Sequence, residues 1–143
     1  MASLTTLESL LARFAAAECS WISSVRPDGR VHSVPVWHVW TNGRAYIVTK
    51  DNAVKVGNIA SNPNVVVALP DPFDPFIIEG VALLKQTISP EVAGFFKVKY
   101  DWDPANDTDY STLIEIRVNK VLAWGKHGDG RWTAADIAGL YAS

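Results

Sequence analysis

The sequence predicts a mainly β, α+β fold in which an antiparallel β-barrel is flanked by short helices. Two turn dipeptides, Asp28-Gly29 and Asn42-Gly43, separate β-branched stretches at the close spacing typical of hairpins. Helical periodicity is confined to short segments between or beside these stretches. Strands joined by tight turns pair with antiparallel neighbours, so we expect a closed sheet with helices over its openings.

Composition limits the function classes. The chain has 143 residues, 48% hydrophobic and 20% charged, with a net charge of −2. These values predict one domain over residues 1–143 and argue against nucleic-acid binding. Cys19 is the single cysteine, so it cannot form an internal disulfide. The sequence shows neither a basic-then-apolar leader nor a membrane-length apolar run, so we expect a cytoplasmic protein without a membrane partner.

The first half of the chain is predicted to contain three strands joined by hairpin turns, with a helix before them and a helix after them. Helical spacing of apolar residues predicts a helix over 4–17, and β-branched stretches predict strands over 19–25, 31–40 and 44–49. Pro35 lacks an N–H group, so the strand that contains it is expected at an edge or to carry a bulge. A short helix over 52–61 then ends at Asn62-Pro63.

The second half adds longer strands and two helices. Apolar and alternating patterns predict strands over 65–69, 76–88 and 113–124. Ser89-Pro90-Glu91 predicts a helix start, with the helix continuing to about Tyr100. The remaining segments are expected to be loops over 70–75 and 101–111, a turn over 129–131 and a final helix over 134–141.

The stretch from Thr49 to Lys55 is the most informative for function. A strand ends there in a hydroxyl and a lysine, a helix follows at once, and a second lysine lies in its first turn. A helix start attracts anions through free N–H groups and the helix dipole. Thr49 can donate a hydrogen bond, and Lys50 and Lys55 can supply charge. The pattern suits one phosphate group, while a surface helix with two solvated lysines is the alternative.

Several motifs resemble one known family in their order and spacing. They are the hairpin 26–30 with the strand 31–37, the Val48-Thr49 strand end, Lys55-x-x-Asn58-Ile59 before Asn62-Pro63, Glu79-Gly80 on a long strand, Lys97-x-Lys99-Tyr100, and a last strand ending at Trp124. Together they cover roughly residues 5–127. This arrangement resembles the pyridoxamine phosphate oxidase-related split β-barrel superfamily, whose members bind flavin (FMN) or deazaflavin (F-420).

The resemblance implies an FMN-binding type of split barrel and a homodimer with two cofactor sites between its subunits. The residues expected along the flavin ring and ribityl chain are Ser33, Val34, Pro35, Val36 and Trp37. Those expected at the phosphate are Val48, Thr49, Lys50 and Lys55, with Asn58 in the same helix motif. Glu79 and Gly80 are expected to approach from the other subunit, and Trp124 to flank the ring.

The chain also departs from the pyridoxamine-oxidising members of this superfamily. In those members the motif at these positions resembles Ser-Arg-Lys, whereas this chain has Ala53-Val54-Lys55. One phosphate-binding arginine is therefore missing. The segment Lys126-His127 and Arg131 do not match their pyridoxal phosphate pattern. We therefore do not assign pyridoxamine phosphate oxidation to this chain.

Two functional hypotheses remain at this stage. The first is a flavin-dependent oxidoreductase that uses FMN, or F-420 if Lys97 and Lys99 serve its acidic tail, on a small-molecule substrate. Because the cofactor ring would carry the redox chemistry, no catalytic side chain is named. The second is a non-catalytic flavin- or haem-binding or sensing protein of the same fold, which the missing arginine at Val54 favours.

The histidines and acidic residues do not predict a metal site. His32 and His38 are six residues apart on one strand, about 20 Å at the usual rise per residue. These two histidines and His127 are better interpreted as surface or pocket-lining residues. The acidic stretch 101–111 lacks the glycine and closing glutamate of a calcium loop, so we expect a solvated loop.

Overall fold

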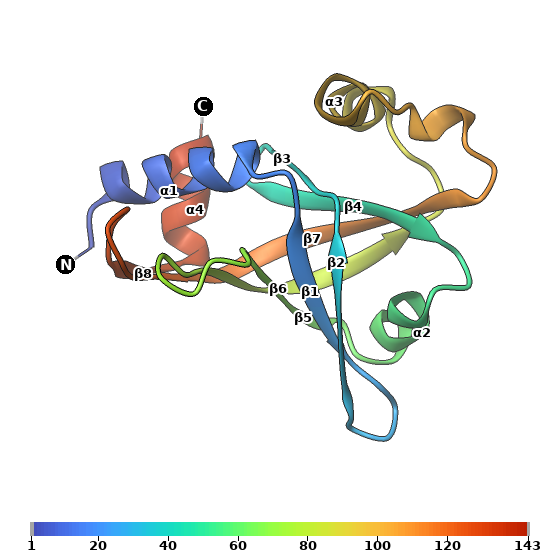
Figure 1. The fold of residues 1–143 in the computed structure, drawn as a ribbon, viewed down its shortest axis with the longest axis horizontal. Helices are drawn as coiled ribbons and strands as arrows, with labels where there is room; N and C mark the ends of the chain where they lie inside the picture. The colour runs from blue at the N-terminus through green and yellow to red at the C-terminus, as the bar shows by residue number, and fades with distance from the viewer. Residues whose placement is uncertain (1, 143) are drawn as a thin grey trace.

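A curled antiparallel sheet forms the centre of the molecule, as the computed structural model of the chain shows for residues 2–142 (Figure 1). The sheet has eight strands and is accompanied by four α-helices and one 3₁₀ helix. The elements in chain order are α1 (Leu4–Ala16), β1 (Ser20–Val25), β2 (Val31–Val36), β3 (Val39–Thr41), β4 (Arg44–Lys50), α2 (Val54–Ser61), β5 (Asn64–Ala68), β6 (Phe76–Lys85), α3 (Pro90–Tyr100), η1 (Pro104–Asn106), β7 (Tyr110–Ala123), β8 (Gly130–Thr133) and α4 (Ala134–Tyr141). This architecture confirms the predicted split-barrel fold, but the expected closure of the sheet is wrong, because β2 and β3 are open edges and do not pair with each other.

The strands follow the order β2-β1-β5-β6-β7-β4-β3, and β8 also pairs with β7. The 14-residue β7 is the longest and most connected strand of the sheet, because it pairs with β4, β6 and β8. Helices α1 and α4 lie together at one end of the sheet, and α2 lies at the opposite end (Figure 1). Helix α3 stands apart over β3 and β4 and covers a second, smaller apolar cluster.

The main core fills the inside of the curled sheet. Its largest fully buried side chains include Phe14 of α1, Phe76 of β6 and Trp132 of β8. The indole N–H of Trp132 donates to the carbonyl of Ser3 at 3.1 Å, so this buried polar atom is satisfied. Strands β1, β5 and β6 alternate buried with more exposed residues, so one face of this part of the sheet is turned toward the core and the other outward.

The predicted strand 31–40 is wrong in its middle, where the structure breaks it between β2 and β3. The two parts pair with different strands, β1 and β4. His38 lies at the break and is fully buried, with its ring nitrogens 2.9 Å from the Ser20 hydroxyl and 2.8 Å from the Phe14 carbonyl. It is therefore a core residue, not the surface or pocket-lining histidine expected. The predicted edge position of Pro35 is confirmed, because β2 ends the sheet.

Other predicted boundaries shift for local reasons. The turn expected over 129–131 is the start of β8, which pairs with β7. Helix α2 begins at Val54, two residues later than expected, because the Ala53 N–H first closes a turn onto the Lys50 carbonyl at 3.1 Å. The loop expected over 101–111 contains η1 and the first residues of β7.

Within residues 2–142, no three histidine, cysteine, aspartate or glutamate side chains lie close enough together to hold a metal ion. In that same range, every helix is too short or too polar to cross a membrane.

Candidate functional site: a cavity between β2, β4 and α3

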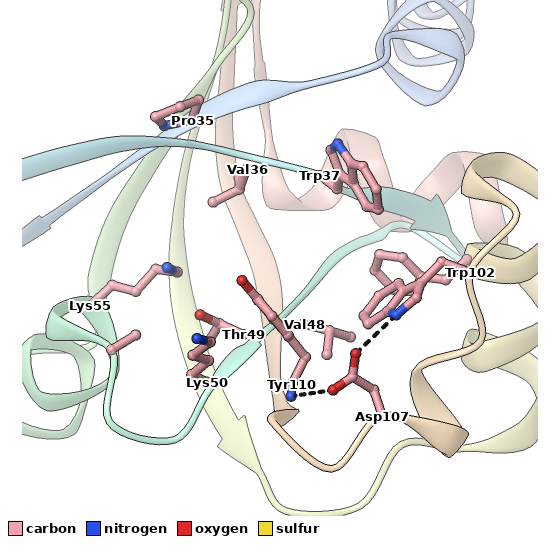
Figure 2. A pocket seen from close by; sticks show the side chains of 12 residues that line it. Pro35, Val36, Trp37, Val48, Thr49, Lys50, Lys55, Trp102, Asp107 and Tyr110 are labelled. Carbon is pink, nitrogen blue, oxygen red and sulfur yellow. Dashed lines mark hydrogen bonds between the residues drawn. The ribbon is translucent and has the colours of Figure 1, made fainter.

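A cavity of about 620 Å³ lies where β2, β4 and the start of α2 face the segment from α3 to β7 (Figure 2). This volume is in the range of small-molecule and cofactor sites. It is lined by Pro35, Val36, Trp37, Val48, Thr49, Lys50, Ala53, Lys55, Phe96, Trp102, Asp107 and Tyr110. The structure thus brings together seven of the residues that the sequence predicted, from Pro35 to Trp37, from Val48 to Lys50, and Lys55.

One end of the cavity is cationic. Helix α2 begins beside it, and Ala53 at the N-cap supplies no side-chain hydrogen bond to the first helical N–H groups. Lys55 lies in the first turn and points toward the cavity (Figure 2). Burial lowers the pKa of the Lys55 ammonium, and no carboxylate among residues 2–142 forms an ion pair with it. A half-buried cation beside an uncapped helix start is suited to an anion.

Thr49 and Lys50 lie at the end of β4 on the same side of the cavity. Thr49 is almost fully buried, with its side chain lining the cavity, and Lys50 is exposed at the mouth. The Lys50 ammonium also lies 5.4 Å from the ring centroid of Tyr110, which is within cation–π range. This end therefore offers one hydroxyl and two ammonium groups to a ligand.

The rest of the cavity lining is largely aromatic, and sequence reasoning missed most of it. Phe96, Trp102, Asp107 and Tyr110 come from α3 and from the segment that was expected to be a solvated loop. Trp102 and Tyr110, which lie on either side of Asp107 in an otherwise polar segment, were the available signal. Their place in the cavity depends on how this segment packs over β4, which no local pattern reveals.

Some predicted site residues lie outside the cavity. The hydroxyl groups of Ser33 and Ser23 are 2.9 Å apart on the outer sheet face, and Val34 packs against the core. Asn58 is buried and donates from Nδ2 to the Ser24 hydroxyl at 3.0 Å, so it ties α2 to β1. Trp124 is exposed beyond the end of β7.

Glu79 and Gly80 lie on β6 and line a groove on the outer face of the sheet. The strand register shifts between them. A Cβ atom at Gly80 would lie 2.5 Å from the Arg117 carbonyl oxygen, so glycine is required there by the close approach of β7.

Lys97 and Lys99, weighed for an acidic cofactor tail, do not line the cavity. The Lys99 ammonium donates to the His38 carbonyl at 2.8 Å, and burial lowers its pKa to about 8. Lys97 is exposed in the last turn of α3.

Comparison with solved structures supports the fold at low sequence identity. A heme binding protein from Mycobacterium smegmatis superposes with a TM-score of 0.71 at 19% identity over 97% of this chain, which spans 61% of that protein. General Stress Protein 26 from Bacillus anthracis str. Sterne superposes with a TM-score of 0.68 at 21% identity, over 89% of this chain and 98% of that one. An F420 reductase superposes with a TM-score of 0.57 at 20% identity, over 71% of this chain and 86% of that one. No curated protein matches this chain.

A family comparison covers most of the sequence. The family described as pyridoxamine 5'-phosphate oxidase matches residues 7–125. This range includes strands β1 to β7 and the whole cationic end of the cavity. The chain therefore belongs to the pyridoxamine 5'-phosphate oxidase family.

Proposed function

We propose that the cavity binds a flavin-type cofactor with its phosphate at the cationic end, and that the protein is an oxidoreductase acting on a small molecule. The observation that carries this proposal is Lys55, a half-buried ammonium without a carboxylate partner beside an uncapped helix start. Desolvating a lone charge costs free energy unless a ligand compensates it. A phosphate group supplies that compensation.

The residues present fit such a cofactor. Thr49 would donate its hydroxyl, and Lys50 and Lys55 would neutralise the phosphate. Pro35, Val36 and Trp37 would border the ring, with Val36 and Trp37 directed into the cavity (Figure 2). When bound, a flavin supplies hydride or electron transfer, while the protein orients the ring and excludes water.

FMN is favoured over F-420 by the charges around the cavity. An acidic tail would need further cations, and the ammonium of Lys99 is already held by a backbone carbonyl. The structural likeness to an F420 reductase keeps F-420 as the rival cofactor.

A haem-binding protein is the second candidate, favoured by the likeness to the mycobacterial heme binding protein. The residues lining the cavity include no histidine, cysteine or methionine. Asp107 already accepts three hydrogen bonds, which leaves the Tyr110 phenol as the available oxygen ligand for iron. Haem binding would therefore depend on Tyr110.

The proposal includes a homodimer formed through the outer face of β1, β2, β5 and β6. Trp21, Val31 and Val66 are exposed on this face. Glu79 is the cross-strand partner of Val66, so it points to the same side. Three large apolar side chains exposed on one sheet face favour an interaction surface. Pairing through it would bring Glu79 and Gly80 against the partner subunit.

The test is a titration of the purified protein with FMN, F-420 and haemin in separate experiments. We expect saturable quenching of flavin fluorescence at submillimolar FMN, tighter than about −4 kcal/mol. Failure of both FMN and F-420 to bind below millimolar concentrations would contradict the cofactor assignment. A haem absorption band that disappears in Tyr110→Phe would support the second candidate instead.

The proposed oxidoreductase activity is tested separately from cofactor binding. Bound cofactor should be reduced by NADPH and then reoxidised by a small-molecule acceptor over repeated turnovers. A protein that binds the flavin but never turns over with any acceptor would contradict the enzyme part alone.

A further inference from the structure

Thr112 on β7 carries a buried hydroxyl group that the contacts of the fold do not explain. Its side chain is fully buried, and its Oγ1 atom forms no hydrogen bond with any group of residues 2–142. The large majority of buried side-chain polar atoms are hydrogen-bonded, because an unpaired one costs free energy of desolvation. Valine has almost the shape of threonine and would avoid this cost, so the hydroxyl group at this position indicates a function.

The strand register places this hydroxyl group next to that of Thr49. Thr49 and Thr112 lie directly opposite each other on β4 and β7, so their Cβ atoms are about 5 Å apart on the same face of the sheet. The preceding pair on this face, Ile47 with Ile114, is apolar and belongs to the main core. Two apolar rows of side chains therefore end side by side in two hydroxyl groups, at the cationic end of the cavity.

The two hydroxyl groups differ in what they can contact. Thr49 lines the cavity beside Lys50, whereas Thr112 does not line it and lies behind Thr49 on the neighbouring strand (Figure 2). A hydroxyl group has one proton to donate and two lone pairs that accept. When Thr49 donates its proton to an anion in the cavity, Thr112 can donate to the Thr49 lone pairs by turning about its χ1 bond. Cross-strand threonine pairs form such hydrogen bonds.

We propose that Thr112 is a positioning residue for the anion at the cationic end: its hydroxyl donates to Thr49 Oγ1 and so directs the Thr49 proton to the phosphate group of the cofactor. Lys50 and Lys55 supply charge to this end, and Thr112 fixes the direction of the neutral donor. Hydrogen bonds that form a chain strengthen one another. Binding of the anion would also satisfy a buried group that is unpaired in the free protein. This inference rests on the proposed function, because it takes the phosphate to lie at Thr49.

The test is Thr112→Val, which removes the hydroxyl group with little change of shape and should have two opposite effects. The thermal midpoint of the free protein should rise by about 2–5 °C, because an unpaired buried hydroxyl group is lost. The dissociation constant for FMN should rise about three- to tenfold, while that for riboflavin, which lacks the phosphate, should stay unchanged. A lower thermal midpoint with equal losses of FMN and riboflavin binding would show a merely structural role and would overturn the proposal.

Further variants show whether the two hydroxyl groups act together. Thr112→Ser keeps the hydroxyl group and should bind FMN within about twofold of wild type. Thr49→Val should weaken FMN binding, and adding Thr112→Val to it should cause no further loss, because Thr112 acts through Thr49. Thr41→Val, on β3 and outside the cavity lining, is the matched control and should leave the preference for FMN over riboflavin unchanged. Additive losses in the double variant, or unchanged FMN affinity in Thr112→Val, would overturn the proposal.

Binding by the wild-type protein separates this inference from the proposed function. A wild type that binds FMN no better than riboflavin would contradict the position of the cofactor phosphate, and inorganic phosphate is then the probe. At an ionic strength kept constant with potassium chloride, phosphate should raise the thermal midpoint of wild type and Thr112→Ser more than that of Thr112→Val. This difference would keep the role of Thr112 in anion binding without the cofactor, and its absence would overturn that role as well.

Discussion

At the residue scale, the buried side chain of His38 both shapes the site and makes the stability of the fold depend on pH. Its ring stacks on Phe14 with centroids 4.1 Å apart and bonds to Ser20 and the Phe14 carbonyl. These contacts turn the chain inward between β2 and β3, which leaves the preceding Trp37 beside the cavity. Burial lowers the pKa of the His38 imidazole to about 4.

The free energy of unfolding should therefore fall as pH drops from about 6.5 to about 4. In this window the unfolded chain binds a proton that the folded chain excludes from His38, for a total loss of up to about 3 kcal/mol. Urea unfolding across this pH range measures the slope. His38→Gln should flatten it, while His127→Gln, an exposed control, should keep it. An equal slope in wild type and His38→Gln would contradict this account.

At the element scale, the start of α2 is the part of the site that the sequence predicted best. A strand end, a helix start and two lysines lie within seven residues, so local patterning named these residues, although it left a surface helix with two solvated lysines as the alternative. The break at His38 could not be predicted the same way, because its partners Phe14 and Ser20 lie on α1 and β1. Trp102 and Tyr110 in the cavity lining were missed for a similar reason, since their position depends on how the segment around η1 packs against α3 and β7.

The uncapped start of α2 can be tested by supplying a cap. Ala53→Asp should stabilise the protein by about 0.5–2 kcal/mol, because an N-cap carboxylate accepts helical N–H groups. The same charge should weaken FMN binding at least about tenfold by repelling the phosphate. Thermal unfolding and FMN titration measure the two effects.

Ala53→Ser is the matched control, since serine caps without adding charge. It should share the gain in stability and lose much less affinity than Ala53→Asp. FMN affinity that is the same in Ala53→Asp and wild type would show that the phosphate does not lie at this helix start.

At the scale of the whole molecule, the outer sheet face is the dimer interface that we propose. Val66→Lys places a charge in the middle of this face, and desolvating it on association is unfavourable. We expect the wild type to elute in light-scattering chromatography at twice the mass of one 15.6 kDa chain, and Val66→Lys at the mass of one. Val98→Lys, largely exposed on α3 and away from this face, should remain a dimer.

Loss of the dimer should also weaken FMN binding if Glu79 and Gly80 complete the partner's cavity. A monomeric wild-type protein, or a dimeric Val66→Lys, would contradict the proposed interface. The split barrel itself does not depend on this result, because the fold and family rest on the strand order and on the match over residues 7–125.

The most direct test of the central claim compares FMN with riboflavin, which lacks only the phosphate, in wild type, Lys55→Ala and the control Lys126→Ala. We expect wild type and Lys126→Ala to bind FMN at least about tenfold more tightly than riboflavin. Lys55→Ala should lose about 1.5–3 kcal/mol of FMN binding, as expected for a charge-assisted hydrogen bond, with little effect on riboflavin. Equal binding of FMN and riboflavin by the wild type, or an unchanged preference in Lys55→Ala, would contradict the account.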